Sequence, residues 1–310
     1  MERSFIQACL THCLYPERPL PEPPPNVDWK RVYHLLSRHR LAELFCVLGR
    51  AHPGLWPPEL GERLREDRYR ALLRSDRCKE WVNAILSALR RAGIPLIVLK
   101  GWAQIPAVYG GDYGQRTYED IDLLMIPQDA ACAEGILRDL GYHGLMVEPW
   151  PGYRRRYRNS RHYQLPHDPA PFGQAFAIGL HWGLLDPHFY DRRMAVKRFF
   201  ARAQPLRVAG VDVCGLAAED DLVYACGHLA LHHEYDEALF RYYEMASLIL
   251  QAGPAFDWSA AVARAVAWRL VLPVQRVLAH IETLWPGIVP AQALQEISEL
   301  RPTLAERYVH

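Results

Sequence analysis

Hydrophobic positions recur at helical spacing over two stretches in the first third of the chain. The first stretch spans residues 29–48 and the second spans residues 81–91. Apolar residues that return every three or four positions mark one face of a helix. Pro53, Pro57 and Pro58 interrupt the pattern between the two stretches, because proline breaks a continuing helix. The pattern predicts a helical N-terminal region that ends near residue 91.

The hydrophobic period changes after Gly93, which is well placed to end a helix. The apolar runs 94–99 and 121–126 are short and nearly continuous, which predicts buried strands. A helix is expected after Gly101 and another from about 128 to 140. Further strands are expected around residues 163–165, 175–181 and 206–213. Helices on a small mixed sheet predict an α+β fold with an α/β-like core.

Helical spacing returns from Leu216 to near the C-terminus. We therefore expect three parts: a helical region over residues 1–91, a core over 92–215 and a second helical domain over 216–310. A proline-rich stretch at 19–25 is typical of an extended linker.

Composition narrows the class of protein. The chain has 310 residues, half of them apolar, and a formal net charge of +1. It has no apolar run of the roughly 20 residues that cross a bilayer, and its start lacks the pattern of a secretory signal, so a cytoplasmic location without membrane partners is expected. Seven scattered cysteines favour reduced thiols over a disulfide framework. Near-neutral charge also argues against a large nucleic-acid surface.

The most informative polar residues are Asp120 and Asp122. Side chains alternate along a strand, so both carboxylates should project on one side while Ile121 points away. Magnesium prefers oxygen ligands and often takes one or two carboxylates together with substrate phosphates. Aspartates two positions apart are also common as turn or cap residues, and the pair alone does not distinguish these interpretations.

Lys100-Gly101-Trp102 lies where the first strand is expected to turn into a helix. Glycine there would let phosphate approach the backbone, and the start of the helix would favour an anion. Lys100 and Arg116 could neutralise a triphosphate. The order strand, glycine turn, helix and Asp-x-Asp strand is more specific than any one of these parts.

The sequence resembles a large bacterial nucleotidyltransferase family, mostly uncharacterised, in which Lys-Gly replaces the usual Gly-Ser. The matching residues are Leu99-Lys100-Gly101, Tyr109, Arg116, Asp120-Ile121-Asp122-Leu123-Leu124, Leu140-Gly141-Tyr142 and Leu180-His181-Trp182. The resemblance covers roughly residues 27–250 and is strongest from 94 to 142. It implies a polymerase-β-type nucleotidyltransferase core and metal-dependent nucleotidyl transfer from a triphosphate, with a helical C-terminal part shaping the acceptor site.

The resemblance and the residue pattern together give a set of expected roles. Asp120 and Asp122 would bind magnesium, or manganese as the alternative ion, and His181 would contact substrate or act as a base. The nucleotide-binding residues would be Lys100, Gly101, Trp102 and Arg116. The partners would be a nucleoside triphosphate and an unknown acceptor, with a small molecule or peptide favoured over RNA.

One position departs from the family pattern. Such folds usually carry a third carboxylate on a later strand, and here that position is Gly179. Either another acid such as Asp186 replaces it, or the site is weakened or inactive. Two alternatives to the transferase therefore stay open: a degenerate fold that binds nucleotide or a partner without turnover, and a toxin-like RNA nucleotidyltransferase. The second would use the arginine-rich segment 153–158, which is otherwise typical of an exposed loop.

A group of histidines follows in the C-terminal part. His228 and His232 stand four residues apart, so they should share one helical face, and His233 is adjacent. They could line the acceptor cleft or lie on the plain surface of the helix. The spacing does not fit the HExxH zinc motif.

Overall fold

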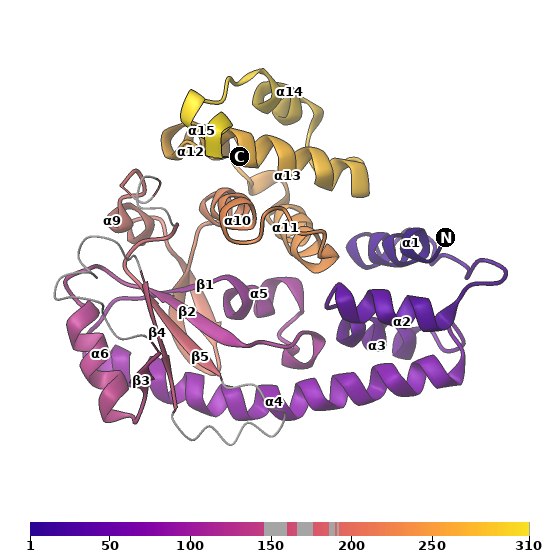
Figure 1. Cartoon of the computed structure of the whole chain (residues 1–310), viewed down its shortest axis with the longest axis horizontal. Helices are drawn as coiled ribbons and strands as arrows, with labels where there is room; N and C mark the ends of the chain where they lie inside the picture. Colours follow the sequence, from indigo (N-terminus) through magenta and orange to yellow (C-terminus); the bar gives the residue numbers. More distant parts are fainter. Residues whose placement is uncertain (146–159, 166–175, 186–189, 191, 310) are drawn as a thin grey trace.

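A computed structural model describes residues 1–145, 160–165, 176–185, 190 and 192–309 (Figure 1). Within these residues, seven strands form one mixed sheet in the order β3-β4-β5-β2-β1-β7-β6. The strands are β1 (Ile97–Leu99), β2 (Asp120–Leu124), β3 (His143–Gly144), β4 (Ser160–Gln164), β5 (Ala177–His181), β6 (Gln204–Val208) and β7 (Val211–Gly215). At the centre, β2 runs antiparallel to β1 and parallel to β5. The mixed sheet with its many helices confirms the predicted α+β class.

The N-terminal region is helical, as the sequence predicts. Its helices are α1 (Glu2–Leu14), α2 (Trp29–Arg38), α3 (Ala42–Ala51) and α4 (Pro58–Arg91). Helix α3 ends before Pro53, and α4 begins at Pro58, where the missing N–H costs no helical hydrogen bond. Helix α1 lies within the region expected to be helical, although the hydrophobic spacing identified at residues 29–48 and 81–91 did not locate it. It buries Phe5, Ile6 and Leu10 in the larger of the two hydrophobic cores.

One face of the sheet packs on α4 and on α6 (Ala130–Asp139). Val82, Ile85, Leu86 and Leu89 of α4 are fully buried at the spacing of one helical stripe. Figure 1 shows α4 passing under the sheet and continuing beneath the N-terminal helices, so this single helix joins the two regions. The division predicted near residue 91 coincides with the end of α4. The last turns of α4 nevertheless pack against the sheet, in the same hydrophobic cluster as its strands.

The turn from α4 into the sheet follows from Gly93. This residue has a φ of 71°, and the next amide, of Ile94, donates to Leu89 O over 3.1 Å, which closes the helix end. The strand β1 then starts at Ile97, three residues later than the apolar run suggested. Pro95 has no N–H to give to a ladder, which explains the later start.

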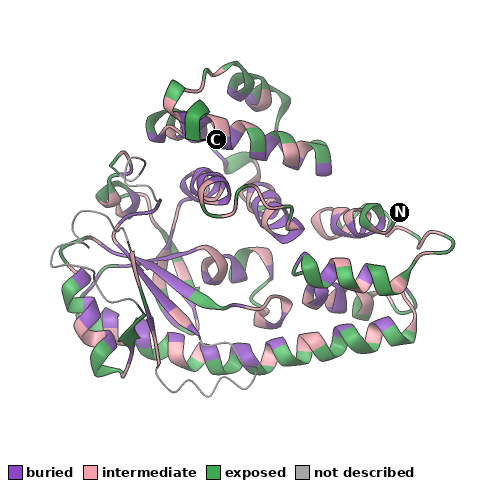
Figure 2. Cartoon of the chain, viewed as in Figure 1, coloured by how far each residue is buried: buried purple, intermediate pink, exposed green. Residues whose placement is uncertain are grey.

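The opposite face of the sheet meets the C-terminal helices. These are α10 (Ala218–His232), α11 (Leu239–Ala252), α12 (Trp258–Trp268), α13 (Val271–Leu284), α14 (Ala291–Glu299) and α15 (Leu304–Val309). Ile97, Leu99 and Leu124 of the sheet belong to the same hydrophobic cluster as α10, α11 and the N-terminal helices. Figure 2 shows that burial is densest on the sheet, α10 and α11 and thins out toward α14 and α15.

Shorter elements complete the fold. They are α5 (Lys100–Val108), which packs against α11, the short helix α9 (Val196–Phe200), and the single turns η1 (Tyr113–Gln115) and η2 (Gly253–Ala255). The helix expected after Gly101 is thereby confirmed.

The single strand expected around residues 206–213 is wrong. The segment forms two antiparallel strands, β6 and β7, with Val208 opposite Val211. Ala209 and Gly210 make the turn with φ values of 48° and 82°, the left-handed pair that a tight hairpin needs. Asn83 supports the turn by donating its side-chain N–H to Ala209 O over 2.9 Å.

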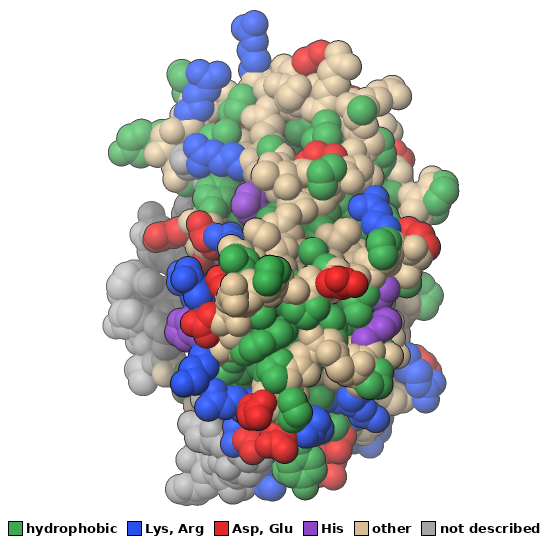
Figure 3. All heavy atoms as spheres, turned by 90° about the vertical axis from the view of Figure 1, so that its right-hand side faces the viewer, with side chains coloured by type: hydrophobic (Ala, Val, Ile, Leu, Met, Phe, Trp, Pro, Cys, Tyr) green, Lys and Arg blue, Asp and Glu red, His purple; other side chains and the backbone are tan. Residues whose placement is uncertain are grey.

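The surface and the thiols agree with the composition. All seven cysteines are free. Among the described residues, no helix combines the length and apolar character that a bilayer crossing requires. Figure 3 views the side on the right of Figure 1, where basic and acidic side chains are interspersed.

Candidate active site

All seven predicted site residues line one cavity of about 510 Å3 between the sheet and the helices α10 and α11. They are Lys100, Gly101, Trp102, Arg116, Asp120, Asp122 and His181. The strand β2 places Asp120 and Asp122 on the cavity side, whereas Ile121 between them is buried in the core beneath the sheet. Lys100 and His181, which are 81 positions apart in the chain, thus line the same cavity because β1, β2 and β5 are neighbours.

Both oxygens of Asp122 have close partners. Lys100 Nζ lies 3.1 Å from Oδ2, and His181 Nε2 donates to Oδ1 over 2.6 Å. Burial alone would raise the pKa of Asp122, but the charges and hydrogen bonds of Lys100 and His181 hold that pKa well below its usual range. Asp122 is therefore ionised at neutral pH.

The second carboxylate, Asp120, behaves differently. It is reached by solvent through the cavity, yet the surrounding protein desolvates it, and this together with the charge of Asp122 raises its pKa to about 6. The two carboxylates therefore lie close enough to oppose each other's ionisation. A bound cation would reduce the repulsion between the two carboxylates and favour the ionised form of both.

Lys100 has an unusual backbone. Its φ is 49°, in the left-handed region that side chains other than glycine rarely adopt. A residue held there costs on the order of 1 kcal/mol or more, and such strain collects at functional sites. Here the conformation turns β1 into α5 and directs the amine back toward Asp122.

Gly101 and Trp102 act through packing. A Cβ on Gly101 would come within 3.0 Å of Arg116 Nη1, so the glycine lets this guanidinium lie against the start of α5. Trp102 is 1% exposed, and its ring packs 5.4 Å from the ring of Tyr118 in the core beneath the sheet. Trp102 therefore borders the cavity as a buried packing residue and does not offer an exposed ring face to a ligand.

Arg116 is paired with a residue that the sequence analysis missed. Its Nη1 lies 2.9 Å from Oε1 of Glu244 on α11, and Tyr109 donates its hydroxyl to the same oxygen over 2.9 Å. The guanidinium also lies over the ring of Phe240 at 4.7 Å. Glu244 stands on an otherwise apolar stretch of α11, and a buried acid within such a stretch was the available signal.

The position expected to carry a third carboxylate is Gly179, which has no side chain. It lies directly opposite Asp122 in the parallel pairing of β2 and β5. Asp186, the suggested substitute, lies outside the described residues. Among the described residues, His162 and His181 are grouped with Asp122 so that three potential ligand atoms lie within 4.8 Å of one another. Asp120 is not part of this group.

The three histidines of the C-terminal part line the cavity from α10 and the loop after it. His228 stacks on His232 with ring centroids 4.7 Å apart. Burial, followed by the charge of Lys100, lowers the pKa of His228 well below its usual range. Burial and then Arg241 lower the pKa of His233 to about 4. His228 and His233 are therefore neutral at physiological pH.

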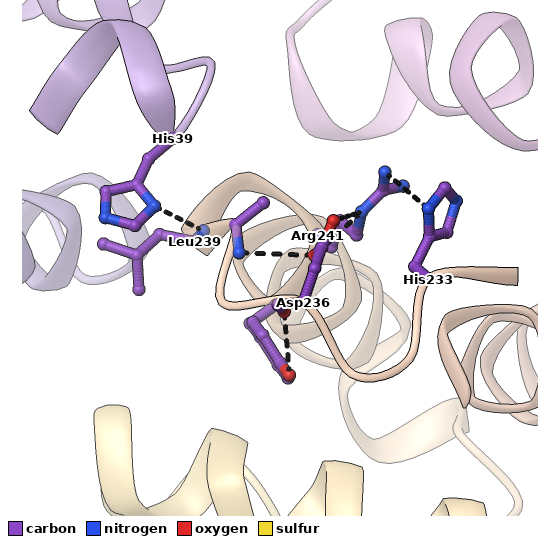
Figure 4. Close-up of polar contacts among 7 residues, drawn as sticks. His39, His233, Asp236, Leu239 and Arg241 are labelled. Atoms are coloured by element: carbon purple, nitrogen blue, oxygen red, sulfur yellow. Dashed lines mark hydrogen bonds and ion pairs between the residues drawn. The ribbon is translucent and has the colours of Figure 1, made fainter.

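Figure 4 shows how the loop between α10 and α11 is fixed beside these histidines. Arg241 donates from Nε to Asp236 over 3.3 Å and from Nη2 to His233 Nδ1 over 3.3 Å. On the other side, the amide of Leu239 donates to His39 Nδ1 over 3.5 Å. The loop is thereby tied to the end of α2, and Arg241 is presented to the cavity.

Asp221 is a second acid that the sequence analysis missed. It stands in the first turn of α10, where an acidic residue is expected merely to complement the helix dipole. Instead it lines the cavity, and burial, together with the charges of Glu244 and Asp220, raises its pKa to about 7. The cavity thus has two acids from β2, two from the helical wall, and Glu119 directly before β2.

Over residues 25–286 the sequence matches the family described as "Uncharacterised nucleotidyltransferase". The chain belongs to this family. The match confirms the resemblance based on the Lys-Gly and Asp-Ile-Asp elements, and it covers both the sheet and most of the C-terminal helices. No curated protein matches the sequence.

Three solved structures are similar to this chain. The antibiotic-resistance factor ANT(2'')-Ia is 14% identical, with a TM-score of 0.41 over 67% of this chain and 98% of its own. An antigenic nucleotidyltransferase-like protein from Paracoccidioides brasiliensis is 18% identical, with a TM-score of 0.45 over 72% and 94%. Lincomycin-bound LnuA, a lincosamide antibiotic adenylyltransferase, is 15% identical, with a TM-score of 0.32 over 53% and 91%. Likeness at this level does not identify a substrate.

The arginine-rich segment 153–158 lies outside the described residues of the nucleotidyltransferase. The toxin-like alternative, which depends on that segment for RNA binding, stays a prediction.

Proposed function

We propose that this nucleotidyltransferase moves a nucleoside monophosphate from a nucleoside triphosphate to a hydroxyl-bearing acceptor and releases pyrophosphate. The observation that carries the proposal is the position of Asp120 and Asp122. They project from one strand into a cavity that also receives Lys100 and Arg116. Carboxylates for a cation and cations for phosphate are the two components that nucleotidyl transfer requires.

The donor set fits a divalent cation. Asp120 and Asp122 would hold magnesium or manganese, because both ions accept carboxylate oxygens and the two carboxylates raise each other's need for a counter-charge. A bound ion would neutralise phosphate charge and favour displacement at the α-phosphorus.

Lys100 and Arg116 would bind the phosphates. Each is paired with a carboxylate, Lys100 with Asp122 and Arg116 with Glu244. Triphosphate binding would then exchange these partners, so the positive charges are kept oriented until the nucleotide arrives. Gly101 contributes by letting Arg116 approach the first turn of α5.

The acceptor would enter along the wall formed by α10 and α11. Its hydroxyl oxygen would form a bond to the α-phosphorus while the bond to pyrophosphate breaks, and the hydroxyl proton must go to a base. His181 donates to Asp122, so we assign it to positioning that carboxylate and assign the proton to Asp221, whose pKa is raised to about 7. The neutral His228 of α10 and His233 directly after it suit a small molecule or peptide better than a polyanion such as RNA.

Two observations favour a second function. Gly179 leaves the usual position of a third carboxylate without a side chain, and Lys100 already compensates Asp122. Both features suit a protein that binds nucleotide without turnover.

Two measurements on wild-type protein and on Asp122→Asn test the proposal. Calorimetry with each of the four nucleoside triphosphates, with and without magnesium or manganese, should show cation-dependent binding that the variant loses. Transfer of label from the α-phosphate to a panel of hydroxyl acceptors should fall on the order of 100-fold or more in the variant. Asp139→Asn on the exposed side of α6 serves as the control.

The outcomes separate the two functions. Transfer that survives Asp122→Asn would exclude the proposed role of this residue. Cation-dependent binding without any transfer would favour the binding function, and an absence of binding to the wild-type protein would refute both.

A further inference from the structure

Three neighbouring strands bring three positions into one row across the sheet. In the pairing of β2 with β5, Asp122 is opposite Gly179, and in the pairing of β5 with β4, Gly179 is opposite His162. Side chains at paired positions project on the same side of a sheet. Asp122 and His162 therefore flank an empty middle position on the cavity side.

His181 occupies the space above that empty position. Its side chain is two residues further along β5 and therefore on the same side of the sheet. A Cβ at Gly179 would stand 2.3 Å from Asp122 Oδ1 and 2.7 Å from His181 Nε2. Any side chain at 179 would force both groups to shift, so the glycine is what allows the imidazole to reach Asp122.

The result is a compact set of metal-ligating atoms. One atom each of Asp122, His162 and His181 lies within 4.8 Å of the other two, and the rings of the two histidines are 6.0 Å apart and nearly perpendicular. Asp122 and His181 are buried, whereas His162 is exposed, so an ion could enter from the side of His162. The three ligands stand on β2, β5 and β4, which are neighbours in the sheet, so the strand pairing fixes their separation.

The chemistry of this set differs from that of a site made of carboxylates. Magnesium favours oxygen ligands, whereas imidazole nitrogen suits the first-row transition ions. A set with two imidazoles and one carboxylate therefore selects against magnesium. A bound ion would take the place of the Nε2 proton that His181 gives to Asp122, because the tautomer that carries its proton on Nδ1 offers the lone pair of Nε2 to the ion.

We propose that Asp122, His162 and His181 bind one divalent transition-metal ion of the manganese or cobalt type, with the histidines in place of the third carboxylate. The proposal deepens the proposed function, because the same Asp122 serves both. It also gives Gly179 a positive role, since the missing side chain creates the space for the imidazole ligand.

The test is metal binding by the full-length, metal-free protein in the absence of nucleotide. Manganese binding is followed by the loss of the free-ion paramagnetic resonance signal, and magnesium binding is measured by competition. We expect manganese to bind at least tenfold more tightly than magnesium. His162→Ala and His181→Ala should each weaken manganese binding on the order of 10- to 100-fold.

Matched variants identify the ligands. His143→Ala, on exposed β3 of the same sheet, should leave manganese binding unchanged. His232→Ala tests the other histidine group of the cavity, and a loss of binding there instead would overturn the proposal. Cobalt absorption adds a second readout, since replacing an imidazole ligand changes the visible spectrum of a bound ion. His162→Ala is the safer variant because its side chain is exposed.

A double variant provides the converse. Gly179→Asp combined with His181→Ala would restore a third carboxylate and remove one of the two groups that it would displace, leaving only the end of the Asp122 side chain to shift. The metal preference should then move toward magnesium. The proposal would be overturned if the protein bound manganese and magnesium with equal affinity and neither histidine substitution changed that affinity.

The experiments distinguish failure of this inference from failure of the proposed function. Histidine-dependent manganese binding without nucleotidyl transfer would support the metal site and count against the transferase. Magnesium-supported transfer that needs Asp122 but tolerates both histidine substitutions would do the opposite.

Discussion

Arg116 and Glu244 form an ion pair of 2.9 Å between the sheet region and helix α11, and both side chains are almost fully buried. Burial raises the pKa of Glu244, while Arg116 and the hydroxyl of Tyr109 oppose that rise. The pair therefore joins the core to the helical wall at the point where phosphate is proposed to bind. Arg116 has to serve both the fold and the ligand.

Glu244→Gln should separate these two roles. The amide keeps the shape and can still accept from Tyr109, but Arg116 loses its counter-charge. We expect the free energy of unfolding in urea to fall by about 2–4 kcal/mol, because a buried charge is left uncompensated. Calorimetry should show tighter triphosphate binding, since the guanidinium no longer has to leave a carboxylate. Weaker binding would show that Arg116 needs Glu244 to hold its orientation.

The backbone of Lys100 gives a second prediction. Lys100→Gly and Lys100→Ala both remove the amine from Asp122, and both should weaken triphosphate binding. Glycine adopts a φ of 49° without strain, whereas alanine does not. Lys100→Gly should therefore be more stable than Lys100→Ala by about 1 kcal/mol. Equal unfolding midpoints in urea would contradict the strain assigned to this residue.

The local sequence pattern was sufficient to predict the strand that carries the two aspartates and the turn that leads into the sheet. The alternation of Asp120-Ile121-Asp122 and the break at Gly93 depend only on strand and helix geometry, so both were predictable. The paired turn residues Ala209 and Gly210 were also visible, but the apolar run around them was interpreted as one strand. Turn chemistry outweighed the hydrophobic pattern there.

The helical wall of the site was not predictable in the same way. Asp221 and Glu244 lie on helices that meet the sheet only after folding. In the sequence Asp221 has an ordinary explanation as an acid in the first turn of α10, and Glu244 gives only the weak signal of an acid among apolar neighbours. His162 is similar: its place beside Asp122 depends on two strand registers that no local pattern specifies. Residues brought together by long-range pairing require the fold before they can be recognised.

Glu306 provides a prediction about the C-terminal helices. Its carboxylate is fully buried and accepts from the amide of Val271 over 2.6 Å and from Thr303 Oγ1 over 2.8 Å. It therefore caps the start of α13 from helix α15. Glu306→Ala should lower stability by about 1–3 kcal/mol, because buried amides lose their acceptor. Amide hydrogen exchange should rise first in α13 and α15, and protection unchanged in these helices would contradict the capping role.

Asp221 links the cavity to pH. Its pKa in the folded protein is raised to about 7 by burial, with Glu244 and Asp220 adding to the effect. A carboxyl with a raised folded pKa destabilises the fold once it is ionised. The cost is absent below the ordinary pKa of an aspartate, grows as the pH rises, and is complete above about 7.

Asp221→Asn should therefore stabilise the protein at pH 8, by an amount on the order of a few kcal/mol, and the gain should shrink as the pH falls from 7 toward 4. Urea unfolding at several pH values measures it, with the surface variant Asp139→Asn as the control. The same substitution should abolish the acidic limb of the rate profile if Asp221 accepts the acceptor's proton, because the ionised form is then required. A variant that keeps both wild-type activity and that limb would move the base elsewhere, with Asp120 and its pKa of about 6 as the next residue to test.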